Sequence, residues 1–281
     1  MAEITAAAVG KLRETSGAGL MDCKKALTET NGNFEVALDW LRKKGAATAV
    51  KKGGRDAREG VIHAYIAPGA KLGLILEVNC ETDFVARNES FLAFCADVAK
   101  KLAANPSADL EADRVAAVTK IGENIKIGRH QRVAVAGNGL VAAYIHTGAK
   151  VGVLVEVGAG KEATTTNDDF KQIVRDITLQ IAAAHPTAVA REEVPADLVA
   201  REREIASTSD AVKNKPAQAM VKIVEGKLEK FYQGICLLEQ GFVKNPDLTV
   251  KAHVAAVAKT LGDEITIRRF IRLQVGESAT A

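Results

Sequence analysis

The amino-acid sequence predicts an α+β protein: a head of three helices, then a duplicated β-β-α-β core, with a helical (coiled-coil) hairpin inserted in the second copy. Three observations lead to this fold class: apolar residues at helical spacing over residues 1–45, a repeated pair of strand-like segments, and a helix-rich stretch found in one repeat alone. The chain has 281 residues, 47% of them apolar and 26% charged, which is typical of a globular protein with roughly two domains.

The first segment, residues 1–45, has the pattern of three short helices. Thr5 precedes an apolar-periodic run and is a candidate N-cap, because its hydroxyl can accept a free N–H of the first turn. The stretch Ser16-Gly17-Ala18-Gly19 interrupts that helix. Asn33 is the candidate cap of the third helix, and we expect Gly45 to end it in the left-handed conformation.

A basic segment follows the predicted head. Residues 42–58 contain seven positive side chains against Asp56 alone, a local charge of +6. The positive residues are Arg42, Lys43, Lys44, Lys51, Lys52, Arg55 and Arg58. Such a segment is either a solvated linker or a contact to nucleic acid. The whole chain carries a net charge of only +3, which does not indicate a nucleic-acid-binding protein.

An internal repeat organises the rest of the chain. Residues 60–78 (GVIHAYIAPGAKLGLILEV) and 139–157 (GLVAAYIHTGAKVGVLVEV) are identical at 10 of 19 positions without gaps. Each copy has two apolar strands joined by a turn that contains Gly, which predicts a β-hairpin. Apolar residues at helical spacing over 91–102 and 170–181 then predict one helix over each hairpin.

The last strand of each unit shows where the two copies differ. Ile121–Ile127 matches Leu261–Ile267 at an offset of 140, whereas the hairpins match at an offset of 79. The second copy therefore holds 61 extra residues (140 minus 79). Each unit reads β-β-α-β, and we expect the two to pack about a pseudo-twofold axis, as a fused homodimer would.

The extra residues predict an antiparallel pair of helices at about 190–240, because Lys215-Pro216 opens a second run of helical spacing after a short polar turn. Such an arm is an interaction element or a spacer. The predicted domains are residues 1–55 for the head and basic linker, 56–138 for core subdomain 1, and 139–281 for core subdomain 2 with its insertion.

The segment Thr82-Asp83-Phe84-Val85 is the main candidate site. It follows the apolar strand over residues 72–78 and precedes a predicted helix, so an acid and a large aromatic residue share a strand-to-helix connection. Connections lie on the surface and often carry function. The alternative is that Phe84 folds back onto the core, as a single Phe more commonly does.

Other kinds of site have no support in the pattern. The four Cys and five His are scattered without the spacing of zinc ligands, so we expect neither a metal nor a cofactor. Unpaired thiols fit a reducing cytosol. The N-terminal residues do not have the pattern of a signal or transit peptide, and no apolar run approaches the ~20 residues of a membrane span. We therefore expect a cytoplasmic protein.

The order of these segments resembles the elongation factor Ts family of bacteria over essentially the whole chain. Three stretches carry the resemblance together, although each is weak alone. They are Leu12-Arg13-Glu14-Thr15 with Gly17-Ala18-Gly19-Leu20-Met21-Asp22-Cys23-Lys24-Lys25-Ala26-Leu27, then Glu77-Val78-Asn79-Cys80-Glu81-Thr82-Asp83-Phe84-Val85, and Lys120-Ile121-Gly122-Glu123-Asn124.

The resemblance implies a translation elongation factor without an active site of its own. Such a factor binds the GDP form of elongation factor Tu and promotes the release of GDP and its exchange for GTP. The loop of Thr82, Asp83, Phe84 and Val85 would wedge near the partner's magnesium site and displace the ion. We also expect no cofactor and no direct contact to nucleic acid or membrane. The fused repeat favours a one-to-one complex with a pseudo-dimeric core.

Further partner contacts are implied outside this loop. The head resembles the ubiquitin-associated (UBA-like) three-helix fold, which in this family grips a helix of the partner's GTPase domain. A His in the second half of the core also reaches that domain. The matching residues of this chain are Leu12, Arg13, Leu20 and Met21 in the head and His146 in the core.

Departures from the family pattern are few. Leu20 stands where many members have Met, which keeps an apolar contact. The two copies also differ from each other: Gly160-Lys161-Glu162-Ala163 stands where the first copy has Glu81-Thr82-Asp83-Phe84, and the first copy has Ala67 in place of His146. Each copy therefore brings a different tip to one asymmetric surface.

Two rival functions belong to other classes. An enzyme would need a catalytic set, but no Ser-His-Asp or carboxylate pair has a readable context, and no Lys-Ser/Thr follows Gly17-Ala18-Gly19 as a phosphate loop requires. An RNA-binding, translation-associated protein would use residues 42–58. That segment has no interleaved aromatic residues for base stacking, so the exchange factor remains the favoured function.

Overall fold

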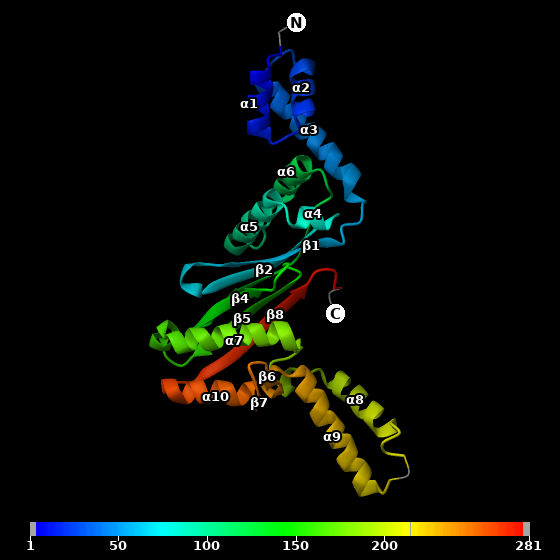
Figure 1. Ribbon diagram of the computed structural model, residues 1–281, viewed down its shortest axis with the longest axis vertical. Helices are drawn as coiled ribbons and strands as arrows, with labels where there is room; N and C mark the ends of the chain where they lie inside the picture. The colour runs from blue at the N-terminus through cyan, green and yellow to red at the C-terminus, as the bar shows by residue number, and fades with distance from the viewer. Residues whose placement is uncertain (1–3, 214, 278–281) are drawn as a thin grey trace.

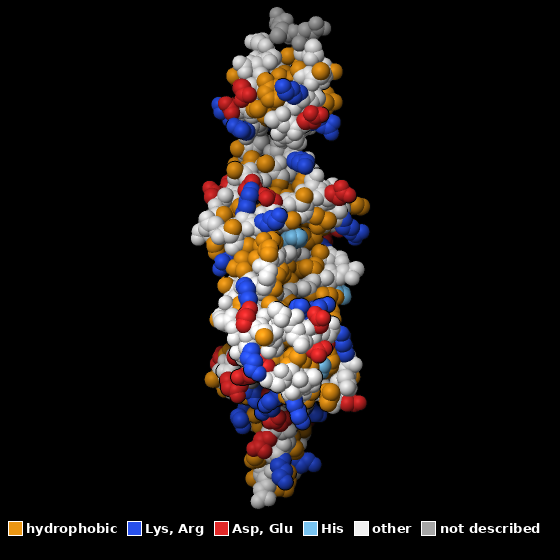
Figure 2. All heavy atoms as spheres, turned by 90° about the vertical axis from the view of Figure 1, so that its left-hand side faces the viewer, with side chains coloured by type: hydrophobic (Ala, Val, Ile, Leu, Met, Phe, Trp, Pro, Cys, Tyr) orange, Lys and Arg blue, Asp and Glu red, His pale blue; other side chains and the backbone are white. Residues whose placement is uncertain are grey.

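The computed structural model describes residues 4–213 and 215–277. The fold is α+β, as predicted, and its parts lie along one long axis: a helical head, a core of sheets and helices, and a two-helix arm (Figure 1). A narrow neck joins the head to the core, and hydrophobic side chains gather across the middle of the core (Figure 2). Residues 278–281, the end of the second predicted subdomain, lie outside the described part. Within the described ranges, no helix is long and apolar enough to cross a membrane.

The head consists of α1 (Ala6–Ser16), α2 (Leu20–Glu29) and the first half of α3 (Phe34–Gly53). Both predicted caps are confirmed: the Thr5 hydroxyl accepts from the N–H of Ala8, and the Asn33 side chain accepts from the N–H of Val36. Gly17 ends α1 with φ of 66°, a value that glycine adopts without strain. These caps and breaks place the three helices around their own apolar cluster.

The prediction that Gly45 ends the third helix is wrong, because α3 continues to Gly53. A Cβ at position 45 would lie 2.6 Å from Oγ1 of Thr119 in α6 (Glu111–Ile121). The glycine therefore permits a close approach between two helices. Most of the basic segment 42–58 is consequently part of a helix that runs from the head to the core.

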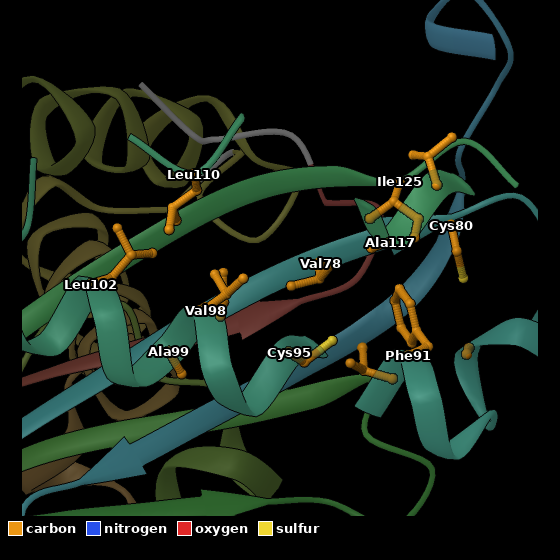
Figure 3. Packing of buried hydrophobic residues seen from close by; sticks show 14 of the residues in the cluster. Val78, Cys80, Phe91, Cys95, Val98, Ala99, Leu102, Leu110, Ala117 and Ile125 are labelled. Atoms are coloured by element: carbon orange, nitrogen blue, oxygen red, sulfur yellow. The ribbon is translucent and has the colours of Figure 1, made fainter. Parts of the chain in front are cut away.

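The first half of the core is an antiparallel sheet with strand order β1-β2-β3. Its strands are β1 (Glu59–Ile66), β2 (Leu72–Cys80) and β3 (Lys126–Ala134), with a short 3-10 turn, η1 (Pro68–Ala70), between the first two. Helix α5 (Glu89–Ala104) covers the outer face, where its Phe91 and Cys95 pack near Val78 and Cys80 of β2 (Figure 3). Strand β2 is buried along nearly its whole length because a second sheet covers its inner face.

The second half of the core has the corresponding order, β4-β5-β8. Its strands are β4 (Gly139–Ile145), β5 (Val151–Ala159) and β8 (Ile265–Gln274). A 3-10 turn, η2 (Glu162–Thr166), leads into α7 (Asp168–Ala184), which covers the outer face. Its predicted apolar face is buried, through Phe170, Ile173, Val174, Ile177 and Ile181. The core thus has four layers, with two sheets between two sets of helices (Figure 1).

The prediction of one helix per unit is wrong. A second helix precedes the last strand in each half: α6 before β3, and α10 (Val250–Leu261) before β8. Apart from single-turn helices and the inserted arm, each unit is therefore β-β-α-α-β. These helices bury few large side chains, with Ala117 and Val118 buried in α6, so their apolar spacing is weak. The local signal was the glycine after each helix, Gly122 and Gly262, which both adopt left-handed caps.

Glycines set the distance between the two sheets. A Cβ at Gly73 of β2 would lie 2.5 Å from Cγ1 of Val141, and a Cβ at Gly152 of β5 would lie 2.5 Å from Cγ2 of Ile62. Neither position has room for a larger residue. The inner faces therefore meet at closer range than side chains at these positions would permit, and six buried aliphatic residues fill the interface around them.

Polar contacts across the interface are reciprocal. Lys71, in the turn of the first hairpin, donates to the carbonyl of Gly139 at 3.0 Å. Lys150, in the turn of the second hairpin, donates to the carbonyl of Gly60 at 3.0 Å. Each lysine thus binds the first residues of the other half's sheet, which ties the two hairpins together at both ends of the interface.

A buried carboxylate lies in each half of the interface. The guanidinium of Arg129 donates to Glu77 at 2.8 Å and to the carbonyl of Gln274 at 2.7 Å. On the other side, Arg269 donates to Glu156 at 2.8 Å and to the carbonyl of Ala134 at 3.1 Å. Carboxylates buried between the two sheets need charged or hydrogen-bonding partners, because an unpaired buried charge destabilises the folded state.

The arm leaves the core between α7 and α10, where the sequence predicts a helical hairpin at about 190–240. It comprises η3 (Arg191–Glu193), α8 (Ala196–Thr208), α9 (Ala217–Ile235) and η4 (Leu237–Glu239), followed by the small ribbon of β6 (Gly241–Phe242) and β7 (Asn245–Thr249). Arg191 fixes its base: the guanidinium pairs with Glu229 and Glu239 and lies over the ring of Tyr232.

Candidate partner-binding site

The candidate loop begins where β2 ends, at Cys80, and forms the one-turn helix α4 (Asp83–Ala86). Thr82 is its N-cap, since the threonine Oγ1 accepts from the N–H of Val85 at 3.3 Å. Helix α4 packs on β1 and β2 beneath it. Thr82, Asp83, Phe84 and Val85 thus lie together on a short, capped turn rather than on a free loop.

Phe84 points away from the protein. Its exposed fraction is 82%, whereas Ala86 is buried and Val85 packs against the core cluster under α5. A single helical turn has one inward side, and Val85 and Ala86 occupy it. The alternative that Phe84 covers the core is therefore wrong. Phe84 is thus an aromatic side chain exposed on a capped turn, which makes it a candidate contact residue.

Asp83 lies beside Phe84 and forms a weak local pair. Its carboxylate is 3.2 Å from the guanidinium of Arg87; the Arg87 side chain is exposed and that of Asp83 is about half exposed. An exposed ion pair of this kind contributes about 0–1 kcal/mol, so little opposes an exchange of partners. Asp83 is therefore available to a cation or hydroxyl that another molecule brings.

Cys80 supports the loop from below as a neutral thiol. Burial, and next the charge of Glu123, raises the pKa of the Cys80 thiol to about 12. The thiol donates to the carbonyl of Thr82 at 3.2 Å. Since the thiolate is the reactive form, Cys80 has a structural role here and is not a nucleophile.

Sequence reasoning did not single out the residues that hold this loop. Glu123, which lies between α6 and β3, accepts the N–H groups of Glu81 and Thr82 and the hydroxyl of Thr82. Glu81 in turn accepts the N–H of Asn124 at 2.6 Å and lies 3.5 Å from Arg55. Their only local signal was that Glu123 and Asn124 belong to one of the three stretches that carry the family resemblance.

His146 lies near the same region of the core. It occupies the exposed turn between β4 and β5, and its Nδ1 is 3.0 Å from the hydroxyl of Tyr144. This turn contacts the first sheet, because the N–H of Ile62 in β1 donates to the carbonyl of Ala149 at 2.7 Å. Helix α4 packs on β1 as well, so the turn of His146 and the loop of Phe84 adjoin a common strand.

The head contributes an exposed apolar pair at the start of α2. Leu20 and Met21 are 51% and 71% exposed. Arg13 of α1, the third predicted contact residue of the head, is exposed as well. Leu12 differs: its side chain is fully buried in the head's cluster. In the folded head Leu12 supports α1 from inside, and its contact with a partner stays a prediction.

A cleft of about 640 Å³ separates the head from the candidate loop. Arg13, Gly17 and Leu20 line it from the head, and Val85 and Lys120 line it from the core. The fold thus brings residues from all three stretches that carry the family resemblance to one concave surface. Within the described ranges, no group of three or more His, Cys, Asp or Glu is arranged to hold a metal ion.

Comparisons with known proteins place the chain in a family. The family model described as Elongation factor TS matches residues 81–277. A protein named Elongation factor Ts from Symbiobacterium thermophilum is 46% identical, covering 99% of this chain and 93% of the relative. Proteins of that name from Nostoc punctiforme and Nitratidesulfovibrio vulgaris are 40% and 39% identical, covering 99% of this chain and 94% and 98% of the relatives. The chain belongs to the elongation factor Ts family.

Proposed function

We propose that this protein is a guanine-nucleotide exchange factor in translation: it binds the GDP form of elongation factor Tu and promotes the release of GDP and its replacement by GTP. The observation that carries the proposal is Phe84, an 82% exposed aromatic ring on a capped and anchored turn, with Asp83 beside it. Membership of the elongation factor Ts family supports elongation factor Tu as the partner. The chain acts without an active site or cofactor of its own.

The proposed mechanism is a wedge. A GTPase holds its nucleotide through the amides of a phosphate loop and a bound magnesium ion. Phe84 enters an apolar gap near that ion, and Asp83 attracts a basic or hydroxyl group there. Both movements shift the groups that hold magnesium and phosphate. Thr82 and Val85 keep the turn in shape during insertion, by the cap and by packing on the core.

The wedge alone accounts for part of the effect. Burying one Phe yields about 1.5–3 kcal/mol, whereas each tenfold loss of nucleotide affinity requires about 1.4 kcal/mol. Phe84 thus supplies at most about two powers of ten. Larger effects require further contacts, which we assign to Arg13, Leu20 and Met21 of the head and to His146 of the core.

We also propose that the core arose by duplication and that the domains are residues 1–55, 56–138 and 139–281, with a head of the UBA-like type. The matching strand orders and the reciprocal contacts of Lys71 and Lys150 support two copies of one unit. Because that pseudo-dimeric interface lies within one chain, we propose a one-to-one complex with elongation factor Tu, formed in the cytoplasm without nucleic acid or membrane.

The test is the release of a fluorescent GDP analogue from elongation factor Tu in the presence of excess GTP. Catalytic amounts of this protein should accelerate release in proportion to concentration. A release rate that stays at its spontaneous value refutes the proposal. Equilibrium dialysis of this protein with GDP is the control, because stoichiometric binding at micromolar GDP would indicate a GTPase instead.

A further inference from the structure

Three consecutive residues between α6 and β3 connect the candidate loop to the head's long helix. The carbonyl of Gly122 accepts from Lys52 of α3. Glu123 accepts hydrogen bonds from the loop, and Asn124 binds both segments. The residues joined in this way lie more than 40 positions apart in the sequence, so this arrangement exists only in the folded chain.

Glu123 holds the backbone of the loop with both carboxylate oxygens. Oε2 accepts the N–H groups of Glu81 and Thr82, each at 3.0 Å, and Oε1 accepts the Thr82 hydroxyl at 2.7 Å. Hydrogen bonds to an ionised carboxylate are roughly twice as strong as neutral ones. Because Thr82 is the cap of α4, these bonds fix the direction in which the following Phe84 leaves the surface.

Asn124 fixes the position of Glu123 itself. It is completely buried, and its side-chain amide donates to the carbonyl of Arg55 at 2.8 Å and to that of Gly53 at 3.4 Å. Its backbone N–H donates to Glu81 at 2.6 Å. The segment that grips the loop is therefore anchored to the end of α3, the helix that begins in the head.

The second half of the core contains a comparable brace. Asp263, at the position that matches Glu123, accepts the N–H of Lys161 at 2.9 Å and the hydroxyl of Thr164 at 2.5 Å. These bonds hold the corresponding connection of the second unit, which has no Asp-Phe pair. The brace is thus a feature of both units, while only the first unit's brace carries Phe84, which provides a matched control within one molecule.

We propose that Glu123 is a positioning residue for nucleotide exchange, which holds the Thr82–Val85 turn so that Phe84 is already directed at the partner before binding. This inference rests on the proposed function. A loop that is ordered in advance loses little conformational entropy on insertion. More of the binding free energy is then available to displace groups at the partner's magnesium site. Without Glu123, the head still binds the partner, but the wedge is in place for only part of the time.

The experiment compares the wild type with Glu123→Ala, Glu123→Gln and the control Asp263→Ala. The first measurement is NMR-detected deuterium exchange of the Glu81 and Thr82 N–H groups in the free protein, which requires no partner. The second is the saturation curve of GDP release from elongation factor Tu, which separates kcat from KM. Thermal melts establish that each variant is folded at the assay temperature.

In Glu123→Ala we expect both amides to exchange at least about tenfold faster, since their acceptor is gone. If the wedge is then competent for about a tenth of the time, kcat falls about tenfold. KM changes less than about twofold because the head's contacts remain. For Glu123→Gln, which keeps one acceptor oxygen, we expect amide exchange rates and kcat between those of the wild type and of Glu123→Ala. Asp263→Ala leaves both amides and kcat at wild-type values.

Three results overturn the proposal: unchanged exchange of the Glu81 and Thr82 amides in Glu123→Ala, faster amide exchange with unchanged kcat, or an equal loss of kcat in Asp263→Ala. The last would show that general loosening of the core, rather than the direction of Phe84, sets the rate. If the wild type itself leaves GDP release at its spontaneous rate, the proposed function fails, and amide exchange still decides whether Glu123 holds the loop.

Discussion

Phe84→Ala separates a contact residue from a structural one. Since the residue is already 82% exposed, removal of its side chain takes little apolar surface out of the folded core. We expect the free energy of unfolding to change by no more than about 0.5 kcal/mol, as for ordinary surface substitutions. Under the proposed function we expect the side chain to act in the complex, where burying a Phe contributes about 1.5–3 kcal/mol.

That energy sets the expected kinetic effect. A loss of about 1.5–3 kcal/mol from the exchange intermediate corresponds to about a ten- to hundredfold slower catalysed release of GDP, at 1.4 kcal/mol per factor of ten. The assay is the release of a fluorescent GDP analogue from elongation factor Tu, beside a thermal melt of each variant. Asp83→Ala should likewise slow release without a change in the melt, because its pair with Arg87 is exposed.

Phe91→Ala is the matched control. Phe91 lies seven residues away on α5, has the same side chain and is completely buried. Its removal opens a cavity and should cost about 3–5 kcal/mol of stability. Exchange per folded molecule should nevertheless stay near the wild-type rate. If Phe84→Ala lowers the melting temperature as Phe91→Ala does, and exchange per folded molecule is unchanged, the reasoning about Phe84 is refuted.

The remaining predictions concern the interface and the arm. In a denaturant titration, Gly152→Ala should destabilise the protein by about 1–3 kcal/mol, because the added methyl group collides with Ile62. Gly226→Ala lies in the interior of α9 with open space around it and should stabilise the protein by about 0.5–1 kcal/mol in the same titration. Burial raises the pKa of Glu156, but bonds from the N–H of Ala136 and from Arg268 and Arg269 outweigh it and hold the pKa below its ordinary value of 4.5. The stabilisation from ionised Glu156 is therefore present above pH 4.5 and lost as the pH falls through the lower folded-state pKa. Glu156→Gln should cost about 1–3 kcal/mol at pH 7 and progressively less in acid, and an equal cost at pH 3 would contradict this. Replacing residues 200–227 with a short Gly/Ser linker should preserve a cooperative melt, since the base of α9 that packs on the core is retained; a non-cooperative product would show that the arm belongs to the core.

Local features of this fold follow from neighbouring residues and were predictable. Thr5 and Asn33 cap helices through bonds that span three positions, so the residue type and its place suffice. The strands of both hairpins follow from apolar runs on either side of a Gly-containing turn. The repeat predicted two units with the same order of strands along the chain, and the two sheets have corresponding strand orders, β1-β2-β3 and β4-β5-β8.

Features that depend on distant neighbours were not predictable in this way. Gly45 reads as a helix end, because the sequence does not reveal that α6 will pass within contact distance of it. Leu12 and Met21 are both apolar and close in sequence, yet one is buried and the other 71% exposed. Which side of a helix meets the core depends on how the helices pack, and spacing alone leaves the outward apolar residues unassigned.

The candidate site also has some features that neighbouring residues predict and others that depend on distant residues. Strand-to-helix connections lie on surfaces, so the position of Phe84 and Asp83 was accessible from the pattern around them. The outward direction of Phe84 follows from the burial of Ala86 on the same turn, and the anchoring of that turn follows from Glu123, about 40 residues away. Side-chain hydrogen bonds of such long range form only after the chain has folded and depend on its geometry, and no local spacing records them.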